Sequence, residues 1–184
     1  MGEQNIANFS VGRNNMPGLV RYIFILLHLP LQVVVTDHAN HALTLLQTVP
    51  LHGQDGVISV GGDGMFAEVF NGVTIRAARD ASLDVDDKAT EFVRPGIRVG
   101  FIPGGDYDLL ICCDAEHICL GSTDSISMCL HGTTDPVTAA LHIVLGDSML
   151  VDAVAIHSAQ RLERFAMTMV SYGYFGDLMT HSEK

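Results

Sequence analysis

Residues 57–73 read VISVGGDGMFAEVFNGV, and this stretch decides the fold. The run VISV, rich in β-branched residues, is typical of a strand buried in a parallel sheet. After the glycines the apolar residues recur at helical spacing, which predicts a helix that begins near Gly64 and ends at Gly72 as a C-cap. The stretch therefore predicts a strand, a tight turn and a helix.

The turn between them consists of Gly61, Gly62, Asp63 and Gly64. Glycines let a ligand approach the backbone closely, and the N–H groups at a helix N-terminus favour an anion such as phosphate. A carboxylate beside such a site is useful if it holds Mg²⁺ or takes a proton from a hydroxyl. The alternative is a plain tight turn in which Asp63 caps the helix.

The surrounding sequence predicts further alternating elements. We expect a buried helix at residues 19–29, a core strand at 32–35, a helix at 37–46 and a strand at 97–102. This pattern predicts an α/β fold with a Rossmann-like, doubly wound parallel sheet. Its ligand-binding edge would collect Thr36, the glycine turn and the residues from Pro103 onward.

The later sequence predicts a helix from Asp135 to Gly146, with Pro136 in its first turn. Residues 148–157 and 164–171 are then typical of two strands of a hairpin. Residues 74–95 are polar and acidic, and we interpret them as a loop or a solvated helix rather than a metal site. His38 and His41 are spaced like metal ligands on a helix, but we see no third ligand nearby and interpret them as structural.

Composition excludes several classes of function. The 184 residues carry 10 basic and 21 acidic side chains, and the net charge of −11 argues against nucleic-acid binding. The four cysteines lack paired spacing, which fits free thiols in a reducing compartment. We expect no signal peptide and no transmembrane segment, since the most apolar region is short and interrupted.

Four blocks of sequence carry a resemblance to a known family: TDHANHA at residues 36–42, VGGDGMFAEVFNGV at 60–73, GSTDSISMCLHGTTDPVTAALHIVLGDS at 121–148 and SYGYFGDLMTHSEK at 171–184. The second block resembles the GGDG signature of the diacylglycerol kinase catalytic superfamily, which includes diacylglycerol, sphingosine and ceramide kinases. Together the four blocks resemble the ceramide kinases most. The resemblance implies a lipid kinase that uses ATP and Mg²⁺.

The resemblance also implies roles for individual residues. Asp63 would be the catalytic base or the carboxylate that holds the metal, and Asp177, in GYFGD, would lie near the acceptor hydroxyl, although a turn or cap aspartate fits the sequence equally well. Asp152 is a second candidate carboxylate in this part of the chain. The residues expected to hold the nucleotide are Thr36, Gly61, Gly62, Gly64, Glu68, Ser122 and Thr123.

The chain also departs from the family pattern. The loop that holds nucleotide phosphates is split by residues 105–120, which we interpret as an insertion that forms an extra strand or helix, or as an artefact of the gene model. The family's first strand and glycine-rich loop have no counterpart beyond a remnant at residues 11–15. We expect an α/β nucleotide-binding domain at residues 1–147 and the start of a truncated β-sandwich lipid-binding domain at 148–184, so that the family pattern is incomplete at both ends.

The expected function is transfer of the γ-phosphate of ATP to the primary hydroxyl of ceramide, by a cytoplasmic protein at a membrane surface. One alternative is a catalytically inactive fragment or degenerate paralogue. Another is the same reaction on sphingosine or diacylglycerol. The sequence predicts no oligomeric state.

Overall fold

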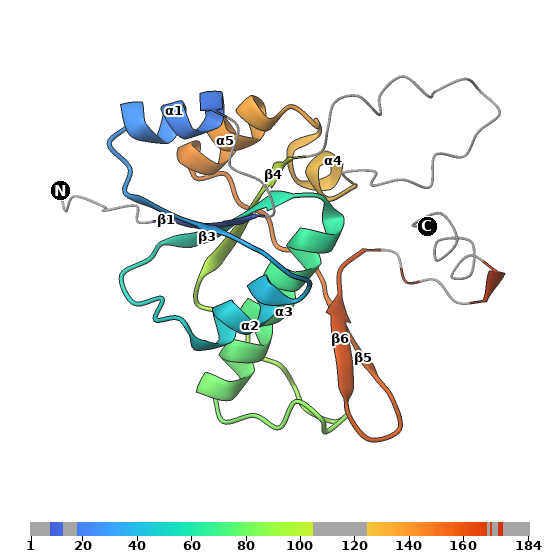
Figure 1. Cartoon of the computed structure of the whole chain (residues 1–184). Coiled ribbons are helices and arrows are strands. Elements are labelled where there is room, and N and C mark those ends of the chain that lie inside the picture. Colours follow the sequence, from blue (N-terminus) through green and yellow to red (C-terminus); the bar gives the residue numbers. More distant parts are fainter. Residues whose placement is uncertain (1–7, 13–17, 105–124, 169, 171–172, 175–184) are drawn as a thin grey trace.

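The computed structural model describes residues 8–12, 18–104, 125–168, 170 and 173–174. Six strands and five helices are assigned in these residues (Figure 1). In chain order they are β1 (Asn8–Gly12), α1 (Gly18–Leu26), β2 (Leu31–Val35), α2 (His41–Thr48), β3 (Gly56–Gly61), α3 (Asp63–Asp80), β4 (Arg98–Pro103), α4 (Ser125–His131), α5 (Pro136–Leu145), β5 (Val154–His157) and β6 (Leu162–Ala166).

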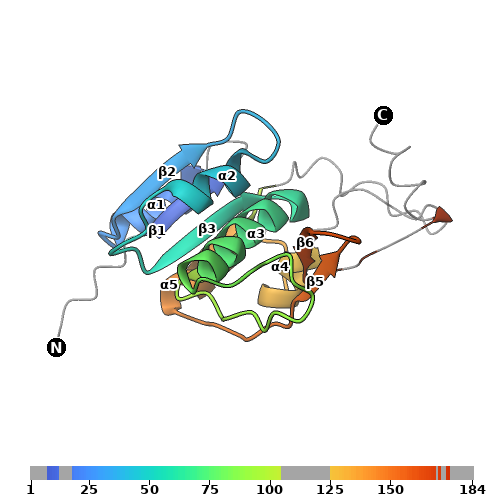
Figure 2. The same ribbon diagram turned by 90° about the horizontal axis from the view of Figure 1, so that it is seen from below.

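The first four strands form one parallel sheet in the order β2-β1-β3-β4. All three pairings are parallel, and Gly61 at the end of β3 is opposite Pro103 at the end of β4. Helices cover both faces, α1 and α5 on one side and α2 and α3 on the other (Figures 1 and 2). The predicted doubly wound α/β fold is confirmed.

The expectation that the first strand is missing is wrong. Residues 8–12 form β1, which pairs with β2 on one side and with β3 on the other. The supposed remnant therefore contains the end of a central strand. Residues 13–15, which would begin the first glycine-rich loop, lie outside the described residues.

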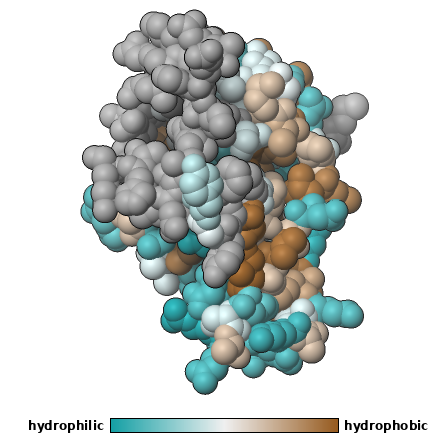
Figure 3. All heavy atoms as spheres, turned by 90° about the vertical axis from the view of Figure 1, so that its right-hand side faces the viewer, coloured by the Kyte–Doolittle hydropathy of each residue, from teal (hydrophilic) through white to brown (hydrophobic). Residues whose placement is uncertain are grey.

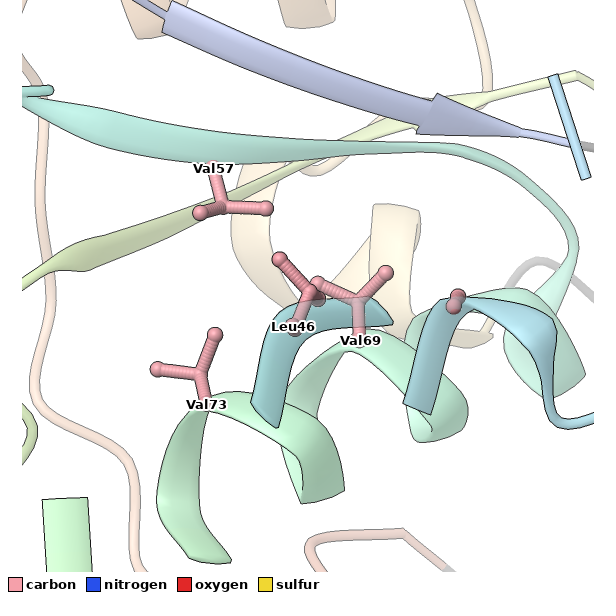
Figure 4. Close-up of a cluster of buried hydrophobic side chains, with 5 residues drawn as sticks. Leu46, Val57, Val69 and Val73 are labelled. Carbon is pink, nitrogen blue, oxygen red and sulfur yellow. The ribbon is translucent and has the colours of Figure 1, made fainter. Parts of the chain in front are cut away.

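The core on the α2 and α3 side consists of small and branched side chains that are almost fully buried. Figure 4 shows Leu46 of α2, Val57 of β3 and Val69 and Val73 of α3 gathered between the sheet and the two helices. Burying each such side chain contributes about 1.5–3 kcal/mol. A second core on the opposite face consists of Phe24, Ile58, Val60, Ile102 and Ala140.

Helix α3 extends to Asp80, so the predicted end at Gly72 is wrong. Residues 74–80, expected as a loop or a solvated helix, are helical and continue α3, with Thr74 and Ala78 buried. Gly72 is buried in the middle of the helix, where α2 approaches closely. A Cβ atom at Gly72 would lie 3.0 Å from both the Leu43 carbonyl oxygen and the Leu46 Cβ. Gly72 therefore allows α2 to pack closely against α3, and it does not end α3.

Helix α1 is less buried than predicted. Phe24 is fully buried against the sheet, whereas Ile25 and Leu26 are more than half exposed. Among the described residues, no helix combines the length and the apolar character needed to cross a membrane.

Helix α5 has the ends that the sequence predicts. Asp135 caps it by accepting a hydrogen bond from the Thr138 N–H at 2.7 Å, and Pro136 stands in the first turn. Gly146 ends it in the left-handed conformation, at φ 81°.

Strands β5 and β6 form an antiparallel hairpin beside the main sheet, which confirms the prediction in shorter form (Figure 1). The polar connection after α3 holds this hairpin. His157 of β5 makes a hydrogen bond with the Val85 carbonyl oxygen at 2.9 Å, and the Asp86 carboxylate accepts the Leu162 N–H at 2.8 Å. Part of the connection after α3, which was expected to be solvated, therefore contacts the hairpin.

Candidate active site

The glycine turn lies at the carboxyl end of β3, where the sequence analysis expects ligands. Gly61 adopts φ 151°, which L side chains rarely adopt, and an added Cβ atom would lie 3.1 Å from the Met65 Cβ. Gly104, the residue after β4, packs directly against it, since the Gly104 N–H donates to the Gly61 carbonyl oxygen at 3.1 Å. A Cβ atom at Gly104 would lie 3.0 Å from the Gly61 backbone. The ends of β3 and β4 are thereby fixed side by side at one edge of the sheet.

Helix α3 begins directly after this turn. Gly62 is the N-cap residue, with an extended backbone and no side chain to cover the first N–H groups of the helix. Gly64 is exposed, and an added Cβ atom would have no neighbour within 4 Å among the described residues. As far as the structure describes the chain, the helix N-terminus therefore has open space beside it for an anionic group.

Asp63 is the first residue of α3, and its carboxylate caps a different helix. Its Oδ2 accepts hydrogen bonds from the Ser125 N–H at 3.2 Å and the Ser125 hydroxyl, and its Oδ1 accepts the Ile126 N–H at 3.3 Å. The alternative that Asp63 caps its own helix is wrong, since the N-cap of α3 is Gly62 and no side chain caps it. Donors among the described residues take three of the about four acceptor positions of this carboxylate, and the fourth can serve a further donor or a cation.

Ser125 is the residue at this site that the sequence analysis missed. It stands directly after the expected nucleotide-binding segment GSTD, and its partner is 62 residues away in the chain. Its place directly after that segment was the available signal, because Ser is favoured where a helix begins.

Helix α4 is held at its other end by His131. One ring nitrogen, Nε2, makes a hydrogen bond with the Phe101 carbonyl oxygen at 2.9 Å, while Nδ1 is buried and has no partner in the part of the chain that the structure describes. Burial lowers the pKa of the His131 imidazole, which keeps the ring neutral. His131 and Asp63 thus fix the two ends of α4.

A cavity of about 270 Å³ opens beside Asp63. Its wall is mostly apolar and comes from α3, α4 and the β5–β6 hairpin, with Asp63 and Arg164 as its charged side chains. The apolar residues include Phe66, Phe70, Ile126, Ile156, Met167 and Val170. Figure 3 views the molecule from the side of α4 and the hairpin, and apolar side chains gather at mid-height on this face. The carboxylate therefore lies where a polar turn meets an apolar cavity.

Two predicted nucleotide-binding residues lie farther along the same edge. Thr36 is buried, with 5% of its surface exposed, directly after β2. The Glu68 carboxylate accepts the Asn40 N–H at 2.9 Å and the Ala42 N–H at 3.2 Å. Glu68 thus caps the first turn of α2. The same two hydrogen bonds fix the backbone of the turn that follows Thr36.

Other predicted site residues are not placed. Ser122, Thr123 and Asp177 lie outside the described residues, as does the segment 105–120 that we interpret as an insertion. Asp152 is described and is exposed in the connection before β5.

These observations define an α/β protein with a glycine turn at a helix N-terminus, a carboxylate in that turn and an apolar cavity beside it. Residues 6–113, more than half of the chain, match the family model described as the diacylglycerol kinase catalytic domain. The chain belongs to this family of lipid kinases.

The curated relatives that the chain resembles include ceramide kinases and a sphingoid long-chain bases kinase. The chain is 35% identical to the ceramide kinases of Mus musculus and Homo sapiens over 162 residues, which is 88% of this chain and 28% and 27% of theirs. It is 31% identical over 170 residues to the sphingoid long-chain bases kinase 1 of Arabidopsis thaliana, which is 90% of this chain and 18% of that protein. The chain thus spans less than a third of the length of these relatives.

Proposed function

We propose that this chain is part of a lipid kinase that transfers the γ-phosphate of ATP to the primary hydroxyl of ceramide. The observation that carries the proposal is the position of Asp63, between an open helix N-terminus and an apolar cavity. The open helix N-terminus suits the phosphates of ATP, and the apolar cavity suits an acyl chain of the lipid. The similarity to ceramide kinases favours ceramide over other lipid alcohols.

In the proposed arrangement the triphosphate lies along the carboxyl ends of β2, β3 and β4. Backbone N–H groups at Gly62 and Gly64 would donate to its oxygens, and the Thr36 hydroxyl would add a contact from the next turn. Ser122 and Thr123 are proposed to complete this cradle. Donors that are already in place stabilise the charge of the transferring phosphoryl group without further reorganisation.

The proposed chemical step uses Asp63 as the base. The acceptor hydroxyl oxygen attacks the γ-phosphorus and forms the new P–O bond, while the bond from the γ-phosphorus to the bridging oxygen breaks and its electron pair leaves with ADP. The proton of the hydroxyl passes to the free acceptor position of the Asp63 carboxylate. Asp177 is proposed to lie near the same hydroxyl.

The alternative role proposed for the free acceptor position of Asp63 is to hold Mg²⁺ instead of accepting the proton. The Asp63 carboxylate and the Ser125 hydroxyl are hard oxygen ligands in contact with each other, and Mg²⁺ is bound in proteins by one or two carboxylates together with phosphate oxygens. When bound, the ion would offset the negative charge of the phosphates.

The experiment is the transfer of labelled γ-phosphate to ceramide, diacylglycerol and sphingosine, presented in mixed micelles to the 184-residue chain. We expect label in ceramide, with Asp63→Asn lowering the rate by at least about a hundredfold, the scale of a lost general base. Asp147→Asn is the control, because Asp147 is exposed beyond the end of α5 and lies outside the proposed site.

Each outcome has a separate meaning. Full activity in a folded Asp63→Asn protein overturns the role of Asp63, and label in diacylglycerol or sphingosine alone overturns the choice of ceramide. If the chain binds a fluorescent ATP analogue but labels no lipid, the inactive alternative holds for this chain. We propose that the protein works at the cytoplasmic surface of a membrane, where these lipids are accessible.

A further inference from the structure

We propose that Asp37, His38 and His41 form a binding site for a divalent transition-metal ion of the Zn²⁺ type, separate from Asp63. The three residues lie in the turn that leads from β2 into α2. From the sequence the two histidines lack a third ligand and are interpreted as structural, whereas in the structure the adjacent Asp37 lies beside both of them.

The three ligand atoms lie close together. Oδ1 of Asp37 lies 2.9 Å from Nδ1 of His41 and is in direct contact with Nδ1 of His38. All three atoms lie within 4.8 Å of one another, and two ligand atoms that each lie about 2.0–2.2 Å from one Zn²⁺ are about 3–4 Å apart. The two imidazole rings stack with centroids 4.6 Å apart and planes 7° apart, so the exposed His38 ring has to rotate before both nitrogens can bind one ion.

The chemistry of the set selects the class of metal. Two imidazole nitrogens and one carboxylate oxygen are the donors of zinc sites that keep an open coordination position. Imidazole suits zinc and its neighbours in the transition series, whereas Mg²⁺ prefers an octahedron of oxygens. The site is therefore chemically distinct from the oxygen donors at Asp63 and Ser125.

The backbone that carries the ligands is fixed in advance. Glu68 holds the N–H groups of Asn40 and Ala42, which flank His41, and the Thr44 hydroxyl donates to the Asn40 and His41 carbonyl oxygens. Asn40 adopts φ 62°, which gives the turn its direction into α2. A fixed turn lowers the entropy lost when the ligands close around an ion.

An ion at this site has to replace hydrogen bonding within the cluster. The Asp37 N–H donates to Nδ1 of His41 at 3.3 Å, which uses the lone pair of that nitrogen. The same nitrogen lies 2.9 Å from the Asp37 carboxylate, so an ion that takes over this lone pair would sit between the nitrogen and the carboxylate oxygen. The competing explanation is a protonated His41 that pairs with Asp37, and such pairs contribute little where they are exposed.

The test is a titration of the nucleotide-free chain with Zn²⁺ and, for its visible absorption, with Co²⁺. The thiols are alkylated first, because Cys112, Cys113 and Cys119 lie outside the described residues and thiolates bind both metals. We expect one tight equivalent, with the Co²⁺ spectrum of nitrogen and oxygen ligands. Long-range ¹H–¹⁵N NMR should show coordination through Nδ1 of His38 and His41.

The variants decide between the two explanations. His38→Gln, His41→Gln and Asp37→Asn should each weaken Zn²⁺ binding at least about tenfold, since even partners in the outer shell of a metal site affect affinity about 10–100-fold. His52→Gln is the control, an exposed histidine outside the cluster. Absence of Zn²⁺ binding, or equal binding in the folded His41→Gln chain, overturns the site and leaves an ordinary ion pair. Because no nucleotide or lipid is present, the result is independent of the proposed kinase activity.

Discussion

The side-chain amide of Asn71 on α3 pairs with both backbone polar groups of Phe165 on β6. Its oxygen accepts the Phe165 N–H at 2.7 Å, and its nitrogen donates to the Phe165 carbonyl oxygen at 2.9 Å and to the Ala67 carbonyl oxygen at 2.8 Å. Asn71 is buried and 94 residues from its partner. One amide thereby fixes the hairpin, and with it one wall of the cavity, to the helix that carries Asp63.

Asn71→Ala should lower the free energy of unfolding by about 2–6 kcal/mol, since two buried backbone groups lose their partners at about 1–3 kcal/mol each. Urea denaturation followed by circular dichroism measures the change. Gln160→Ala, at the exposed turn of the hairpin, should change stability by less than about 0.5 kcal/mol. Equal losses in the two variants would contradict the role of Asn71.

Gly72→Ala should destabilise the chain by about 1–3 kcal/mol, because its new methyl group would overlap the Leu43 carbonyl oxygen and the Leu46 side chain. Gly64→Ala is the matched control in the same helix. Its methyl group would meet open space, so stability should stay the same or rise by up to about 1 kcal/mol. Thermal melting distinguishes the two, and a stable Gly72→Ala chain would show that α2 can move away.

Glu68→Ala should cost about 0.5–2 kcal/mol, the range for loss of a helix cap. The affected backbone is the turn after Thr36, so we also expect weaker binding of the ATP analogue than in the parent chain. Glu91→Ala removes an exposed carboxylate from the connection before β4 and serves as the control. Weaker nucleotide binding without loss of stability would instead indicate direct contact between Glu68 and the ligand.

Stability should fall as the pH drops below about 6.5, partly through His131. Burial lowers the pKa of this imidazole in the folded chain, so below the ordinary pKa the unfolded chain binds more protons than the folded one. Protonation is therefore linked to unfolding. His131→Gln should flatten this part of the pH dependence, measured by urea denaturation between about pH 8 and pH 5. An unchanged slope would assign the dependence to other groups.

The elements that the sequence predicted correctly are those with local signals. Strand β3 is a run of β-branched residues that ends in glycine, and α5 has Asp135 and Gly146 at its two ends. The parallel sheet followed from the alternation of such segments. These signals lie within a few residues of the element that they describe.

The errors have non-local causes. Strand β1 is short, and what identifies it is its pairing with two strands that come later in the chain. From the sequence alone Gly72 resembles a C-cap, and only its contact with α2 in the structure explains why it is glycine. At the candidate site, the glycine turn was recognisable from its own residues, whereas the contact between Asp63 and Ser125 spans 62 residues and has no local signature.

The position of β1 has a consequence for how the chain folds. β1 lies between β2 and β3, and β4 lies outside β3, so each later strand of this sheet adds to an edge of the strands already present. Until residues 56–61 have been added, β1 pairs with β2 alone, and its other edge has unpaired backbone groups. A chain shortened to end before β3 should therefore associate more readily than a chain that contains it.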